Sequence, residues 1–226
     1  MKLKKTHLEF TKEMATRTET LVSKGVVGEE ENQVMKLATE KAELDLKTSL
    51  ANLDEVNASG EIPLNELYTP VVGSRDFVSE RLKIERKEAE LGLKPLGSRL
   101  GRFQPLVKKG LVSKDQLDQI QAEMAARKAT IGEIQKRLDL RKRFVAGTIM
   151  AQEVEIEDRM TEAERNMSST QSKVDSLQEQ LKRLRALETR GLISPTESHK
   201  LQYALDAAQF ELKLAAVEMD VLQKAK

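Results

Sequence analysis

The segment Arg183–Glu197, RLRALETRGLISPTE, contains the end of one helix followed directly by the start of another, and the chain repeats this pattern. The two related segments are RTETLVSKGVVGEEE, which starts at Arg17, and RFQPLVKKGLVSKDQ, which starts at Arg102. Aligned on their glycines, all three have an Arg eight residues before the Gly, a Leu four residues before it, and a Glu or Gln six residues after it. The glycines are 85 and 81 residues apart. The sequence is therefore built from an internal repeat.

Each segment has residues suited to a tight turn between two helices. The turn glycines are Gly25, Gly110 and Gly191. Gly is the residue that most easily takes the left-handed conformation at a helix C-terminus, and the basic residue before it suits the negative end of the helix dipole. Ser113 and Ser194 are expected to cap the next helix, and a Gln or Glu three residues later completes a capping box. The first copy has Gly28 in place of the Ser.

Apolar residues spaced alternately by four and three follow each turn at equivalent positions. After the third turn these residues are Leu201, Leu205, Ala208, Leu212, Ala215, Met219 and Leu222. Such heptad spacing, fixed to the same turn three times, is typical of coiled-coil arms. Arg127 and Arg141 fall on the second of these seams, where they are expected to fix the register or to mark contact with water. The predicted fold is all-α, with long antiparallel coiled-coil helical hairpins in tandem.

The predicted organisation is three hairpins with one connector. Residues 1–57 form the first hairpin, whose first arm is short, and residues 58–73, with two Pro and two Gly, form the connector. The second hairpin covers 74–147 and the third covers 148–226. In the ascending arm of the second hairpin, Gly92, Pro95 and Pro105 predict a kink or a local break.

The boundary between the second and third hairpins is open to two interpretations. The apolar register slips by one residue near Gly147, which predicts a turn at about 146–149. Six arms would then run up and down with all three turns at one end. The alternative is one unbroken helix from 114 to 189, about 110 Å long.

The composition argues against several classes of function. The net charge is +1 and basic residues are not interleaved with aromatic ones, so no nucleic-acid partner is expected. The chain has no Cys, and its two histidines, His7 and His199, are far apart, so neither a metal site nor a cofactor is expected. Because no catalytic motif or phosphate-binding loop occurs, we expect neither an enzyme nor a small-molecule substrate.

Targeting signals are also not evident in this sequence. No apolar run approaches the roughly 20 residues of a membrane span. Met1 leads directly into a charged amphipathic segment rather than a signal peptide. The chain is therefore expected to lack its own signal or anchor.

The repeated segments resemble the hairpin tips of periplasmic adaptor subunits, the membrane fusion proteins of tripartite efflux pumps and type I secretion systems. The resemblance rests on the spacing Arg-x3-Leu-x6-Ser and covers nearly all of the chain outside 57–73. The matching residues are Arg17, Leu21 and Gly28 in the first copy, with Gly in place of Ser; Arg102, Leu106 and Ser113 in the second; and Arg183, Leu187 and Ser194 in the third.

This resemblance implies a function for the tips. In that family the tip residues dock against the helix tips of an outer-membrane channel. It therefore implies an outer-membrane channel or another helical protein as partner, and a location in the periplasm or cell envelope. Self-association is also expected, because about two apolar residues per heptad suffice for a helix pair but not for a deep core.

A second interpretation of the same residues remains open. A basic residue, Gly, two apolar residues and Ser are also ordinary helix stop-and-start chemistry. The alternative function is therefore a structural coiled-coil spacer or oligomerisation module with no channel partner.

Overall fold

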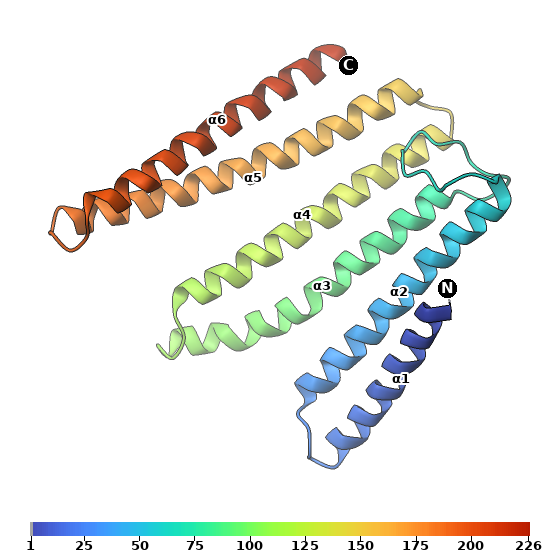
Figure 1. Cartoon of the computed structure of the whole chain (residues 1–226), viewed down its shortest axis with the longest axis horizontal. Helices are drawn as coiled ribbons and strands as arrows, with labels where there is room; N and C mark the ends of the chain where they lie inside the picture. Colours follow the sequence, from blue (N-terminus) through green and yellow to red (C-terminus); the bar gives the residue numbers. More distant parts are fainter. Residues whose placement is uncertain (1) are drawn as a thin grey trace. The chain divides into compact units, whose positions relative to one another are not determined.

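The computed structural model describes residues 2–226, which fold into six α-helices (Figure 1). The helices are α1 (Lys2–Ser23), α2 (Glu29–Ser59), α3 (Phe77–Lys108), α4 (Lys114–Val145), α5 (Ala151–Glu188) and α6 (Pro195–Ala225). α1 packs against α2, α3 against α4, and α5 against α6, so consecutive helices form antiparallel hairpins. Among the described residues the only β-type pairing is an isolated bridge between Val72 and Arg75. The predicted all-α fold of tandem helical hairpins is confirmed.

The chain divides into two compact units. Unit 1 ends at Thr148, and unit 2 spans Ile149–Lys226. Within unit 1, α2 packs against α3 and joins the first two hairpins, whereas unit 2 consists of the α5–α6 hairpin. The ion pairs between α2 and the segment around α3 include Glu40–Lys94, Lys41–Glu88, Asp54–Arg75 and Glu55–Arg81. The first two predicted hairpins therefore share one unit.

The connector of unit 1 spans 60–76 in the structure, a few residues later than predicted. α2 continues to Ser59, and Gly60 follows in the left-handed conformation. α3 starts at Phe77 because the Asp76 side chain accepts a hydrogen bond from the Ser79 backbone N–H, at 3.2 Å. Asp76 thus sets where the helix begins.

α3 runs unbroken through both of its prolines, so the local break expected in this arm does not form. Proline removes one backbone hydrogen bond from a helix. Leu91 and Leu96, on either side of Pro95, are both buried in unit 1. Because tertiary packing provides most of the stability of a helix in a protein, packing on both sides maintains α3.

The chain turns between α4 and α5, as the register slip near Gly147 predicted. α4 ends at Val145 and α5 begins at Ala151, so the alternative of one helix from 114 to 189 is wrong. Gly147 has φ 70°, and the Thr148 N–H donates to the Arg143 carbonyl at 3.0 Å. This pattern is a Schellman turn.

The core of unit 2 is a narrow seam between its two helices. Val174 and Leu181 of α5 and Leu205 and Ala208 of α6 are buried together. Leu177, Leu201 and Leu212 pack around them. Leu201, Leu205, Ala208 and Leu212, heptad positions predicted from the sequence, are therefore the ones with which α6 packs on α5.

The base of unit 1 is held by a buried arginine. Arg141 of α4 is fully buried; its Nε donates to Asp76 Oδ1 at 2.9 Å, and its Nη1 donates to the Leu67 carbonyl at 2.8 Å and to the Thr69 carbonyl. The side chain of Leu67 is only 2% exposed. The connector therefore folds over the base end of α3 and α4 (Figure 1), and Arg141 fixes it there.

Candidate functional site

The three hairpin tips share one backbone geometry. We define tip 1 as residues 24–28, tip 2 as 109–113 and tip 3 as 190–194. At each tip the glycine has φ 70°. The residue after it donates its N–H to the carbonyl of the motif leucine, as Val26→Leu21, Leu111→Leu106 and Leu192→Leu187, each at 3.0 Å. All three tips are therefore Schellman turns, in which the hydrogen bonds set the spacing from Leu to Gly that the three copies share.

The second half of each tip starts the next helix. Ser113 Oγ accepts a hydrogen bond from the Gln116 N–H at 3.3 Å, and Ser194 Oγ accepts one from the Thr196 N–H at 3.3 Å. Gly28 occupies the same position at tip 1 without a side-chain cap. The serine caps are thus confirmed. The second hydrogen bond of each predicted capping box, from the serine backbone N–H to the side chain of Gln116 or Glu197, does not form in the described part of the chain.

The three motif arginines are exposed on the helices that lead into the tips. Arg17 lies on α1, Arg102 on α3 and Arg183 on α5. Within residues 2–226, Arg17 and Arg183 make no ion pair or side-chain hydrogen bond. Arg102 instead pairs with Glu30 in the first turn of α2. Tips 1 and 2 therefore lie at the same end of unit 1, opposite the connector (Figure 1); the position of tip 3 relative to them stays a prediction.

The motif leucines are less exposed than the arginines. Leu21 and Leu106 are half-buried beneath their tips, and Leu187 is 36% exposed. Neighbouring residues therefore cover Leu21 and Leu106 in part, so packing contributes to the place of these two leucines.

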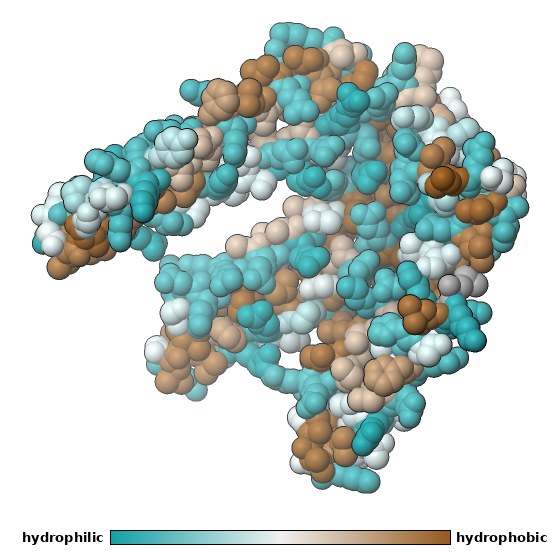
Figure 2. Space-filling model, in the orientation of Figure 1, coloured by the Kyte–Doolittle hydropathy of each residue, from teal (hydrophilic) through white to brown (hydrophobic). Residues whose placement is uncertain are grey.

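The apolar residue that follows each tip glycine was expected from the sequence only to close over the last turn of the preceding helix. Val26 is 68% exposed, Leu111 70% and Leu192 67%. Figure 2 shows apolar surface at the ends of the hairpins, where these residues lie. The signal was present in the sequence, because all three copies have a large apolar residue directly after the Gly.

The turn at Gly147 serves as an internal comparison for the tips. It has the same glycine φ of 70° and the same hydrogen-bond pattern, and α5 begins four residues after its glycine, as the helices after the tips do. At the positions of the motif Arg, Leu and Ser it has Asp139, Arg143 and Met150, and Thr148 follows the glycine. The backbone turn therefore requires the glycine but not the rest of the tip motif.

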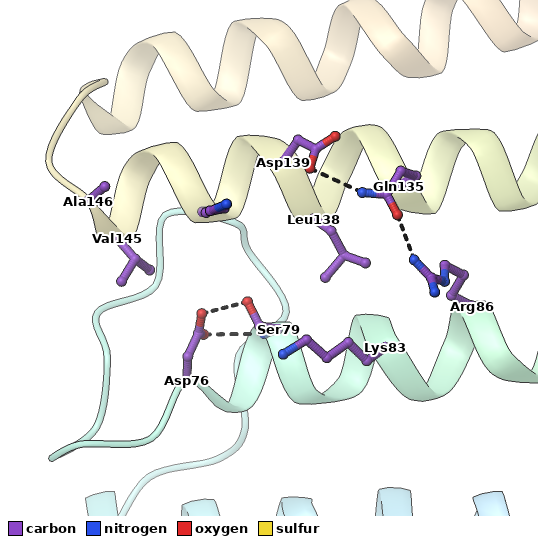
Figure 3. A pocket seen from close by; sticks show the side chains of 10 residues that line it. Asp76, Ser79, Lys83, Arg86, Gln135, Leu138, Asp139, Val145 and Ala146 are labelled. Carbon is purple, nitrogen blue, oxygen red and sulfur yellow. Dashed lines mark hydrogen bonds between the residues drawn. The ribbon is translucent and has the colours of Figure 1, made fainter.

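A groove of about 610 Å³ lies between the base ends of α3 and α4 (Figure 3). Arg86 Nη1 donates to Gln135 Oε1 at 2.6 Å, and Gln135 Nε2 donates to Asp139 Oδ1 at 3.1 Å. These bonds connect α3 to α4 along the groove. Its polar side chains are thus largely engaged with each other, which indicates a structural role.

Asp76 and Lys36 are among the described charged groups with perturbed pKa values. Burial raises the pKa of Asp76, but hydrogen bonds from Arg141 and Ser79 outweigh burial and hold this pKa below its ordinary value. Below tip 1, the hydrogen bond from Lys36 to Glu19 raises the pKa of the lysine. Both shifts favour the charged forms that join neighbouring segments of unit 1.

The described residues contain no group of three or more His, Cys, Asp and Glu side chains arranged to hold a metal ion. None of the described helices has a stretch long and apolar enough to cross a membrane. No family model, curated protein or solved structure is significantly similar to this chain.

Proposed function

We propose that this chain is an adaptor-like coiled-coil protein, or a segment of one, in a transport or secretion assembly of the cell envelope. In this proposal its hairpin tips dock against the helices of a partner such as an outer-membrane channel. The support comes from the resemblance of the tip sequences to periplasmic adaptor subunits and from the exposure of the tip side chains.

The observation that carries the proposal is the difference between the tips and the turn at Gly147. All four turns have the same backbone geometry. Only the three tips add an Arg two helical turns before the glycine and a large exposed apolar residue after it. Since the turn forms without these side chains, the geometry of the turn does not explain their presence at the tips.

The chemistry of these side chains suits recognition of another protein. Arginine is over-represented at the centres of protein interfaces, where it supplies much of the binding energy. An exposed Val or Leu beside it would add apolar area that a partner can bury. A guanidinium group presents five N–H donors to carboxylates or to the free carbonyls at the end of a partner helix. Arg17 and Arg183 have no such acceptor within the described chain, so their donors are available to a partner.

One observation favours the alternative of a structural spacer without a channel partner. Arg102 is not free, because it pairs with Glu30 and connects the first two hairpins near their tips. If Arg17 and Arg183 made equivalent contacts with further copies of this chain, the motif would serve assembly only.

The test is site-specific photocross-linking in bacterial envelopes, with p-benzoylphenylalanine in place of Leu192. We expect a product with an outer-membrane channel or another helical envelope protein. Arg183→Glu should abolish this product, because it reverses the charge beside the docking surface. Lys182→Glu is the matched control, since Lys182 is the exposed neighbour of Arg183 and is not part of the motif.

Both variants should keep the melting temperature of the parent chain, because both side chains are exposed. Products that contain only further copies of this chain would support the spacer instead. Equal cross-linking in the two variants would contradict a role for the tip arginine.

A further inference from the structure

α6 carries a second apolar seam on the side that faces away from α5. Its residues, spaced alternately by four and three, are Tyr203, Ala207, Phe210, Leu214, Val217 and Val221. We call this set the outer seam. Each member lies two residues after a position of the seam that packs on α5, and two residues correspond to about 200° around a helix. α6 therefore has coiled-coil seams on two opposite faces.

The outer seam is exposed along its length. Phe210 is 62% exposed, Leu214 55%, Val217 61% and Val221 59%, and Tyr203 is 79% exposed. Figure 2 shows brown side chains along α6. A contiguous stripe of this kind is unusual on a monomer and marks an interaction surface more often than not.

The repeat identifies what covers the equivalent face elsewhere in this chain. Leu44 and Phe210 both lie 19 residues after their tip glycine, and Ala51 and Val217 both lie 26 residues after it. Leu44 and Ala51 are 4% and 5% exposed, on the face of α2 that packs against α3. In unit 1, this face is thus buried by an antiparallel helix.

Two acidic residues beside the outer seam also have counterparts at the α2–α3 interface. Asp206 corresponds to Glu40, which pairs with Lys94 at 2.8 Å. Asp220 corresponds to Asp54, which pairs with Arg75 at 2.8 Å. On α6 these carboxylates contact only residues of their own helix, Gln202 and Lys224. Among the described residues, no cation of a neighbouring helix pairs with them, in contrast to their counterparts in unit 1.

From this we propose that the outer seam of α6 binds a separate amphipathic helix of another protein, antiparallel to α6, with an apolar heptad seam flanked by Lys or Arg. The seam from Tyr203 to Val221 is about 27 Å long, so the partner helix needs about 18 residues or more. Asp206 and Asp220 are two heptads apart, which places the matching cations of the partner about 21 Å apart.

The charges at the seam argue against a second α6 as the occupant. In an antiparallel pair of coiled-coil helices, equivalent flanking positions meet. Asp206 would lie beside Asp220 of a second copy, and Lys213 would face its own counterpart. Like charges in such contacts disfavour the pairing and select a partner of opposite charge.

The proposal can be tested with two designed peptides of about four heptads, both with Leu at the apolar positions. One has Lys at the flanking positions and the other has Glu. The purified chain should bind the Lys peptide about tenfold more tightly than the Glu peptide, as measured by fluorescence anisotropy. The double variant Asp206→Lys/Asp220→Lys should reverse this preference. Equal binding of the two peptides, or a preference that the charge reversal leaves unchanged, would overturn the proposal.

The apolar contribution is tested with the double variant Phe210→Ser/Val217→Ser, which should weaken binding of the Lys peptide at least tenfold. Ile62→Ser is the control, because Ile62 is 83% exposed in the connector and should not affect binding. Both variants should keep wild-type helicity. Binding of the double Ser variant at wild-type strength would show that the outer seam is not the site.

Sedimentation equilibrium tests whether a second copy of this chain, rather than another protein, covers the outer seam. If the wild-type chain forms a dimer that Phe210→Ser/Val217→Ser dissociates, a second copy covers the seam and the proposal is wrong. Arg183→Glu should leave peptide binding unchanged. The outer seam is therefore tested independently of docking at the tips.

Discussion

Arg141 is the single residue whose role depends most on distant parts of the chain. Its position on a heptad seam predicted either a register function or contact with water. In the structure it is fully buried and binds Asp76 together with the carbonyls of Leu67 and Thr69. Removing one member of a buried ion pair costs about 3–5 kcal/mol, so Arg141 fixes the connector strongly. Contact with water applies instead to Arg127, which is exposed.

The pairing of Asp76 with Arg141 predicts a pH-dependent stability of unit 1. The folded state holds the pKa of Asp76 below its ordinary value, whereas the unfolded state restores it. The free energy of unfolding therefore includes a contribution from Asp76 that is fully present above about pH 4 and is lost as the pH falls through the lower, folded pKa. Asp76→Asn keeps a helix-capping side chain but has no charge. Its destabilisation relative to wild type should be largest at neutral pH and should shrink below about pH 4.

Urea unfolding followed by far-ultraviolet circular dichroism measures this difference at each pH. Asp118→Asn is the matched control, because Asp118 is exposed on α4 and makes no ion pair among the described residues. It should show little change at any pH. A difference between wild type and Asp76→Asn that is constant with pH would contradict the assigned pairing.

At the scale of the elements, the hairpins are defined by how their helices end. All three tips and the turn at Gly147 are Schellman turns, and two of the tips have serine caps. The helices themselves tolerate poor helix formers, since α3 includes two prolines and three glycines. Helix ends are thus controlled by local hydrogen bonds, and helix interiors by packing.

This division predicts opposite effects for two Gly→Ala substitutions in the second hairpin. Gly110 has φ +70°, so Gly110→Ala should destabilise unit 1 by about 1 kcal/mol. Gly101 lies inside α3 with open space at its Cβ position, so Gly101→Ala should stabilise by about 0.5–1 kcal/mol. Urea unfolding of both variants measures the sign of the change in the free energy of unfolding. The same sign for both would show that φ at the tip is not the controlling factor.

At the scale of the molecule, the two units are built differently. In unit 1 the first hairpin depends on the second, because Leu44, Ala51 and Glu55 of α2 are buried at the interface with α3. Glu55 in particular is 4% exposed and pairs with Arg81. Unit 2 has its own apolar seam between α5 and α6.

Two fragments should therefore behave differently. Residues 149–226 should retain their helical content when produced alone, since their core lies within the hairpin. Residues 2–59 should lose much of theirs, because removal of α3 exposes Leu44 and Ala51 and leaves the Glu55 carboxylate without its cation. Circular dichroism of the two fragments at equal concentrations measures the helical content of each. Equal loss of helix in the two fragments would show that unit 2 also depends on the rest of the chain.

The sequence by itself predicted the helices, the tips and the turn near Gly147. These features follow from local information, since heptad spacing defines the face that packs and a glycine after a helical segment defines its end. The positions of Arg17, Arg102 and Arg183 beside the tips came from the same repeat. The sequence did not predict the exposure of these arginines or of the apolar residue after each glycine, because accessibility depends on the neighbouring helices.

The tertiary structure alone decided which faces are covered. Leu44 and Ala51 of α2 correspond to Phe210 and Val217 of α6, but only the pair on α2 is buried, since α3 packs against that face. Arg141 and Asp76 are 65 residues apart in sequence, and no local pattern pairs them. Their pairing requires the connector to fold back over the base of the second hairpin. A periodic sequence fixes the faces of a helix, whereas the partner of each face is set by contacts between distant segments.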